Sequence, residues 1–104
     1  MITKNYVNRY TRRLYKFLDQ GHRITFRKMK KDRGEITTEN LPTELVLDPR
    51  DQVISTLIHE TLHYFYPEAP EKWIIDTENK IIAKLTNRQV KNIIQRLAKN
   101  ISTG

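Results

Sequence analysis

The sequence predicts an α+β fold, on three observations. Apolar residues recur at helical spacing in residues 4–19 and again in three segments after residue 48. Between them, residues 22–47 change to an alternating apolar and polar pattern that is typical of strands. A chain of 104 residues, 38% apolar and 30% charged, is long enough for one modest core. We therefore expect residues 1–104 to form a single domain.

The first predicted element is a basic amphipathic helix over residues 4–19, which Gly21 ends. Three arginines, Arg9, Arg12 and Arg13, lie between its apolar positions, and we interpret them as a solvated helix face rather than a phosphate site. The apolar stripe consists of Val7, Tyr10, Leu14 and Leu18.

Three short strands are expected next. Ile24 and Phe26 alternate with polar residues, and residues 32–34 carry a turn signal. Residues 35–38 can then return as a second strand, and Glu44 to Leu47 form a third. The prediction is a small, mostly antiparallel three-stranded sheet.

A helix then starts at Asp48, the predicted N-cap, with Pro49 in its first position, and ends near Tyr66 before Pro67. One half of its circumference is apolar. The other half is polar and consists of Gln52, Ser55, Thr56, His59, Glu60 and His63.

Two more helices complete the prediction. Pro70 opens one that runs to about Leu85. Thr86, with Gln89 three residues on, forms a capping box that begins the last. The apolar stripe of this C-terminal helix is Val90, Ile93, Ile94, Leu97 and Ile101.

Residues 59–63, His-Glu-Thr-Leu-His, form an HExxH motif on the polar face of the central helix. Histidines four apart on a helix can bind one metal ion, and the intervening Glu60 can take a proton from metal-bound water. Because the chain has no cysteine, histidines and carboxylates must supply every ligand. The motif predicts a Zn²⁺ site with Glu60 as the general base.

A catalytic zinc needs a third protein ligand, and the sequence favours Glu78. This glutamate projects from the apolar stripe of the helix over residues 70–85, where an ionised carboxylate requires a partner or a metal. Asp76 lies on the opposite, polar face. The alternatives are an ion pair between Glu78 and a cation of the first helix, or a third ligand from Glu71, Asp76, Glu68 or His22.

An HExxH motif followed by a glutamate on the next helix resembles the gluzincin zinc metallopeptidases, and at this length the minigluzincins. The resemblance implies a zincin-like fold, zinc bound by His59, His63 and a ligand on the following helix, and an edge strand, such as Glu44 to Leu47, that pairs with a peptide substrate. It also implies that residues 86–104 can cover the cleft in a latent, zymogen-like form.

We therefore expect a cytoplasmic zinc-dependent peptidase without a membrane span or signal peptide. A homodimer through the C-terminal helix is compatible with the sequence. Two alternatives compete with this function. One is a non-enzymatic metal-stabilised scaffold. The other is a nucleic-acid-associated protein, which the net charge of +7 would suit but which the placement of Glu78 disfavours.

Overall fold

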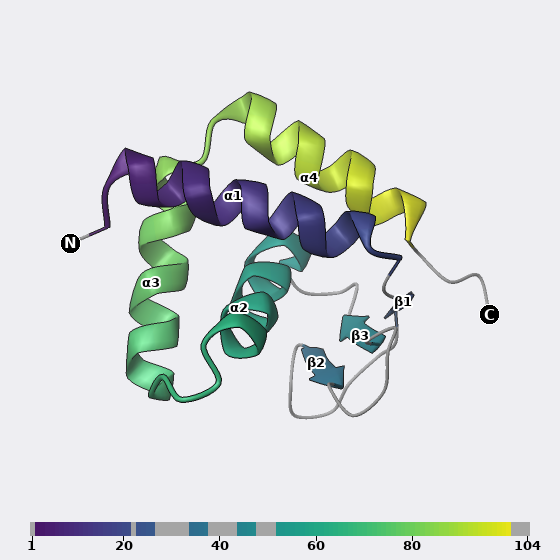
Figure 1. Ribbon diagram of the computed structural model, residues 1–104, viewed down its shortest axis with the longest axis horizontal. Coiled ribbons are helices and arrows are strands. Elements are labelled where there is room, and N and C mark those ends of the chain that lie inside the picture. The colour runs from purple at the N-terminus through teal and green to yellow at the C-terminus, as the bar shows by residue number, and fades with distance from the viewer. Residues whose placement is uncertain (1, 22, 27–33, 38–43, 48–51, 101–104) are drawn as a thin grey trace.

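The computed structural model describes residues 2–21, 23–26, 34–37, 44–47 and 52–100, with side chains for 2–21 and 52–100 (Figure 1). Helix α1 is followed by three strands and then by helices α2, α3 and α4. The bounds are α1 Lys4–Asp19, β1 Arg23–Phe26, β2 Gly34–Thr37, β3 Glu44–Leu47, α2 Val53–Phe65, α3 Glu71–Lys84 and α4 Asn87–Lys99.

The core of the described part is helical, so the α+β prediction is wrong. Where side chains are described, the structure is a four-helix unit without a strand, and every buried apolar residue comes from a helix. The four helices have 13 to 16 residues each, whereas each strand has four. Helices of this length bury their apolar faces by packing against one another. Strands of four residues offer too little apolar surface to form a separate layer of the core. The buried apolar residues are Val7, Tyr10, Leu14, Phe17, Leu18, Leu57, Ile58, Leu62, Ile74, Ile81, Ile93 and Leu97.

The three strands also pair differently from the prediction. β3 lies between β1 and β2, parallel to β1 and antiparallel to β2, so the sheet is mixed. In its register, Leu45 of β3 pairs with Ile24 of β1 on one side and with Ile36 of β2 on the other. Glu44 to Leu47 is therefore the central strand, and the expectation that it is an edge strand is wrong. The edge strand β2 lies against α2.

Local signals locate the two ends of α1 and the start of α4. The Thr3 hydroxyl accepts a hydrogen bond from the Tyr6 amide at 3.1 Å, and Gly21 follows α1 with a positive φ of 80°. The capping box of Thr86 and Gln89 is present at the start of α4, as predicted. The central helix begins at Val53, with Gln52 as its N-cap in an extended conformation and without a side-chain cap hydrogen bond, so the predicted start at Asp48 and Pro49 is wrong. Residues 48–51 themselves lie outside the described residues.

Helix α4 packs along α1 (Figure 1). The Tyr15 hydroxyl donates to the backbone carbonyl of Gln89 at 3.4 Å. The side-chain amide of Gln89 donates to the side-chain oxygen of Asn8 at 2.9 Å. The Arg96 guanidinium bonds Asp19 at 3.3 Å and lies 4.3 Å above the ring of Tyr15. These contacts attach the C-terminal helix to the first one, and the latency of residues 86–104 stays a prediction.

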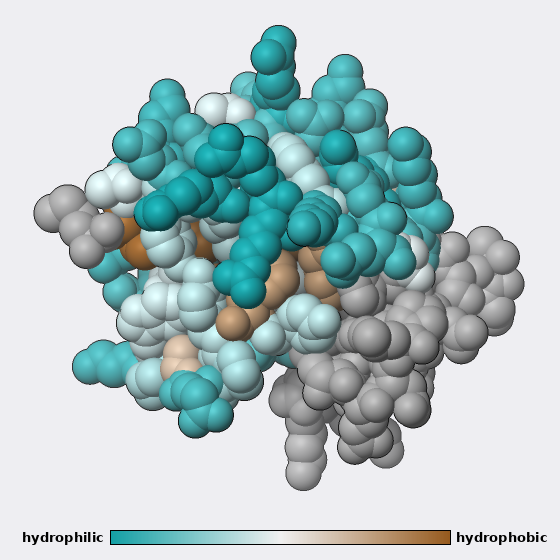
Figure 2. Space-filling model, viewed as in Figure 1, coloured by the Kyte–Doolittle hydropathy of each residue, from teal (hydrophilic) through white to brown (hydrophobic). Residues whose placement is uncertain are grey.

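The face of the molecule in Figure 2 is largely hydrophilic over the described residues, with small apolar areas between polar side chains. The larger exposed apolar residues are Trp73, Ile75, Ile82 and Ile94. No helix among the described residues has both the length and the apolar character needed to cross a bilayer.

Candidate metal centre

Helix α2 places the two motif histidines side by side. The rings of His59 and His63 have centroids 4.9 Å apart, as the i, i+4 spacing predicts. The opposite face of the helix carries Leu57, Ile58 and Leu62, all fully buried, which fixes the rotation of the helix in the core. The His59 side chain is 14% exposed and that of His63 33%, so both lie partly open to solvent.

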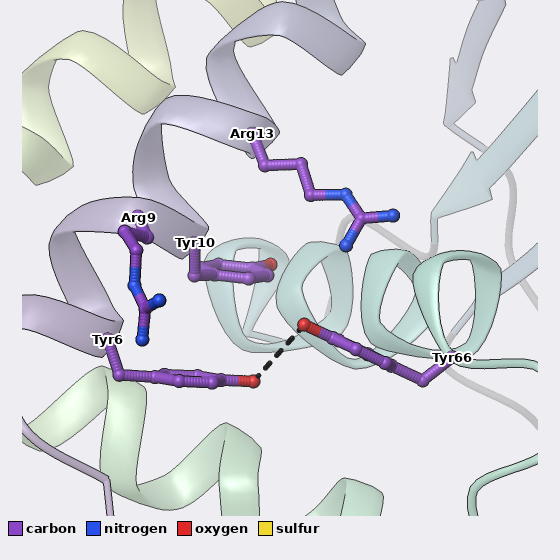
Figure 3. Close-up of a pocket in the computed structure, with 5 residues that line it drawn as sticks. All are labelled: Tyr6, Arg9, Tyr10, Arg13 and Tyr66. Atoms are coloured by element: carbon purple, nitrogen blue, oxygen red, sulfur yellow. Dashed lines mark hydrogen bonds between the residues drawn. The ribbon is translucent and has the colours of Figure 1, made fainter.

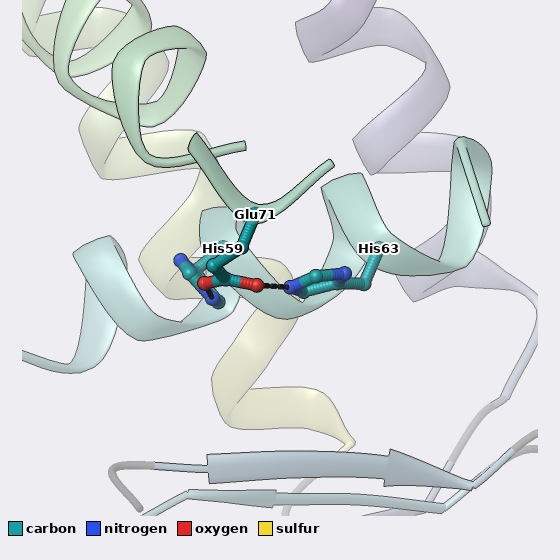
Figure 4. A group of neighbouring side chains, drawn as sticks. All are labelled: His59, His63 and Glu71. Carbon is teal, nitrogen blue, oxygen red and sulfur yellow. Dashed lines mark ion pairs between the residues drawn. The ribbon is translucent and has the colours of Figure 1, made fainter. Parts of the chain in front are cut away.

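The first residue of α3 completes the cluster (Figure 4). One carboxylate oxygen of Glu71 lies 2.9 Å from Nε2 of His59, and the other lies 2.8 Å from Nε2 of His63. The chain reverses direction after α2, and α3 begins directly beyond Pro70. Candidate ligand atoms of these three residues all lie within 4.8 Å of one another.

These three residues can offer three ligand atoms to a metal ion. Two imidazole nitrogens and one carboxylate form a usual ligand set for catalytic zinc, with a fourth position left for water. Ligands about 2.0–2.1 Å from a tetrahedral ion are roughly 3.3 Å apart. The two histidine–Glu71 distances of 2.8 and 2.9 Å are about half an ångström shorter than this, and they involve different oxygens of Glu71, so the carboxylate has to reorient to share one ion with both rings.

Glu78, the favoured third ligand in the sequence, lies on the other side of His59. Its Oε1 is 2.7 Å from Nδ1 of that ring, and its Oε2 accepts a hydrogen bond from the Ser55 hydroxyl at 2.5 Å. The carboxylate is buried, as its position on the stripe with Ile74 and Ile81 predicts. The buried carboxylate therefore has two partners on α2, His59 and Ser55.

Glu60 is half-buried on α2, immediately after His59. It is not one of the three residues whose ligand atoms converge. Such a position is compatible with a proton acceptor that does not bind the ion, and its role as general base stays a prediction.

The other candidate ligands are placed as follows. Asp76 forms an ion pair with Lys80 at 2.9 Å on the exposed face of α3, in agreement with the sequence prediction. Glu68 is exposed in the segment between α2 and α3. His22 lies outside the described residues.

From the sequence, Glu71 is only one of several alternative ligands, and Ser55 is assigned no role. A signal for Glu71 was present, because it follows Pro70 at the start of a helix that must return past the histidines. Ser55 is four residues before His59 and therefore lies one turn away on the same face. The roles of Glu71 and Ser55 both depend on how α2 and α3 pack against each other, and the spacing of residues in the sequence does not show this.

Comparison with known proteins adds no assignment: no family model, curated protein or solved structure matches the chain.

Proposed function

We propose that this protein is a zinc-dependent hydrolase of peptide bonds in which His59, His63 and Glu71 hold the metal. The observation that carries the proposal is the convergence of two Nε2 atoms on one carboxylate, at 2.9 and 2.8 Å, within an HExxH motif. Glu71 also agrees with the gluzincin pattern, because it is a glutamate on the helix that follows the motif. The spacing of fifteen residues on which the resemblance rests belongs to Glu78, so Glu71 shares with it only the position on the following helix.

A bound zinc ion would supply a Lewis acid and lower the pKa of its water towards 7. The task of the protein is then to receive and deliver a proton beside that position. Glu60 is the candidate proton acceptor, because it follows His59 on the helix and is not among the converging ligands. The same carboxyl group can return the proton to the leaving amine.

Glu78 and Ser55 position His59 in this proposal. A carboxylate at Nδ1 orients the ring and leaves Nε2 to face the metal position. The Ser55 hydroxyl in turn fixes Glu78, whose burial leaves it little freedom to move. The Ser55–Glu78–His59 chain is thus a positioning device behind the ligands.

The sheet supports a peptide as the substrate class. The edge strand β2 lies beside α2, which carries the histidines. Among the described strands, β2 pairs with β3 alone, on one of its two sides. An extended peptide can add to such an edge through main-chain hydrogen bonds. We propose these bonds, rather than a deep pocket, as the means of substrate recognition.

The test compares zinc content and hydrolysis in the wild type and Glu60→Gln. We expect both proteins to retain zinc after gel filtration and only the wild type to release fragments from labelled, unfolded casein. Glu68→Ala is the matched control, since it removes an exposed carboxylate outside the cluster. Protein purified without zinc, and unable to take it up, would refute the metal centre. Stoichiometric zinc with equal rates in the wild type and Glu60→Gln would retain the metal and refute the catalytic role.

A further inference from the structure

A second candidate site lies between the start of α1 and the end of α2, and it does not depend on the metal. Five residues line a pocket of about 260 Å³ there (Figure 3). Four come from α1, namely Tyr6, Arg9, Tyr10 and Arg13, and Tyr66 comes from the C-cap of α2. Two guanidinium groups and three phenol rings thus surround one small space.

The charge of the pocket is unbalanced. Arg9 and Arg13 are four residues apart on one face of α1, and like charges at this spacing repel each other. No lining residue is acidic, and neither arginine forms an ion pair with a described carboxylate. A bound anion would relieve this repulsion.

Aromatic contacts hold one of the two guanidinium groups in place. The Arg13 guanidinium carbon lies 4.2 Å from the ring centroid of Phe65 and 5.5 Å from that of Tyr66. Arg13 is therefore oriented before any ligand arrives, which reduces the entropy lost on binding. In Figure 3 its guanidinium extends from α1 towards Tyr66, while Arg9 extends towards Tyr6.

The phenol groups add neutral hydrogen-bond donors. The hydroxyls of Tyr6 and Tyr66 lie 3.5 Å apart, with Tyr6 donating, so the Tyr66 proton can point to a ligand. Burial and the contact with Tyr66 raise the pKa of Tyr6, so that no phenolate forms near neutral pH. The Tyr10 hydroxyl is committed to Thr61 at 2.6 Å, and its ring serves as a wall.

The size of the pocket limits the ligand. Its volume of about 260 Å³ lies just below the range of roughly 300–1,000 Å³ that is usual for drug-sized ligands. At about 30 Å³ per water molecule, it has room for several waters or for one small anion with a short substituent. Arginine side chains are a recurrent means of binding phosphate oxygens, through charge-assisted and often bidentate hydrogen bonds.

We propose that Arg9, Arg13 and Tyr66 form a binding site for a small phosphate-bearing ligand, either phosphate itself or a small phosphate monoester. The arginines supply charge-assisted hydrogen bonds, the Tyr66 hydroxyl supplies a neutral one, and the aromatic walls contact the substituent. Arg9, Arg12 and Arg13 are all exposed on α1, as the sequence predicted, and the proposal gives two of them a ligand.

The test is calorimetric titration of the full chain with inorganic phosphate and with phenyl phosphate at low salt. Saturable one-to-one binding is expected, and Arg9→Gln should weaken it at least tenfold. Arg9 suits this test because it is exposed and its guanidinium, unlike that of Arg13, neither stacks over a ring nor forms an ion pair among the described residues. Tyr66→Phe should weaken binding about threefold. Tighter binding of phenyl phosphate would identify a monoester, and equal binding would identify free phosphate.

Arg12→Gln is the matched control, because Arg12 lies on the same helix with the same charge but does not line the pocket. Its affinity should stay within twofold of the wild type. Equal losses in Arg9→Gln and Arg12→Gln would show a general response of a basic surface and would overturn the pocket. So would binding that Arg9→Gln leaves unchanged, which would place the phosphate elsewhere, for example at the metal centre.

Discussion

The assignment of Glu71 rather than Glu78 as the third ligand leads to our most specific prediction. The two glutamates differ in exposure, since the side chain of Glu71 is 57% exposed and that of Glu78 is 6% exposed. Replacing Glu71 with Ala should therefore change the stability of the metal-free protein by less than about 1 kcal/mol. Replacing Glu78 with Ala should lower it by roughly 1–3 kcal/mol, because Ser55 loses a buried hydrogen-bond partner.

The effects on zinc affinity should follow a different order. A four-ligand zinc site contributes about 10–16 kcal/mol, or roughly 3 kcal/mol per ligand, so Glu71→Ala should weaken binding by 100-fold or more. Glu78→Ala removes an orienting contact to a ligand, for which losses of about 10–100-fold are usual. Glu71→Ala should thus keep the stability of the metal-free protein and bind zinc weakly. Glu78→Ala should be less stable but should lose less zinc affinity than Glu71→Ala.

The assay combines urea unfolding of the metal-free proteins with zinc titration against a chromophoric chelator. Glu68→Ala serves again as the control and should match the wild type in both measurements. Wild-type zinc affinity in Glu71→Ala, together with the larger loss in Glu78→Ala, would refute the assignment and return Glu78 to the ligand set.

Three further predictions concern the core around the sites. Burial raises the pKa of Tyr10 above the ordinary value, so the unfolded chain releases this proton first and the free energy of unfolding should fall as pH rises above about 10. Tyr10→Phe should lose about 1 kcal/mol at neutral pH, through Thr61, and should show a weaker alkaline decline in urea titrations. Thr86→Ala removes the capping box of α4 and should lower stability by roughly 0.5–2 kcal/mol in thermal unfolding, whereas Thr86→Ser should restore it. Ile93→Ala should lower the free energy of unfolding by roughly 2–5 kcal/mol because the side chain is fully buried, and a loss below 1 kcal/mol would contradict the packing of α4 on the core.

The features that depend on neighbouring residues were predictable from the sequence. Residues 4–19 form a helix with the expected buried stripe, and Thr86 begins α4 through the expected box. Each signal acts within a few residues, so a linear pattern contains it. The burial of Glu78 was predictable for the same reason, because its neighbours at helical spacing are isoleucines.

The features that depend on how elements meet were not predictable. Strand order is one example, since alternation marks residues 23–26 and 44–47 as strands but does not show that β3 lies between the other two. The helical core is another example, because it depends on which apolar helix faces pack against each other. The choice between Glu71 and Glu78 belongs to this group as well, since both can reach α2 from the same helix.

The geometry of α3 explains why a single buried glutamate pointed towards the site but not to the ligand that we propose. Glu71 and Glu78 are seven residues apart, which is about two turns and about 10 Å along the axis, so they share one face of the helix. Ile74 and Ile81 on that face are fully buried, and they fix the register of α3 against the core. With that register fixed, one glutamate faces Nε2 of His59 and the other faces Nδ1. The packing of two isoleucines therefore holds both carboxylates at one imidazole, so that a shift of α3 by one turn would remove the third ligand and the orienting contact together.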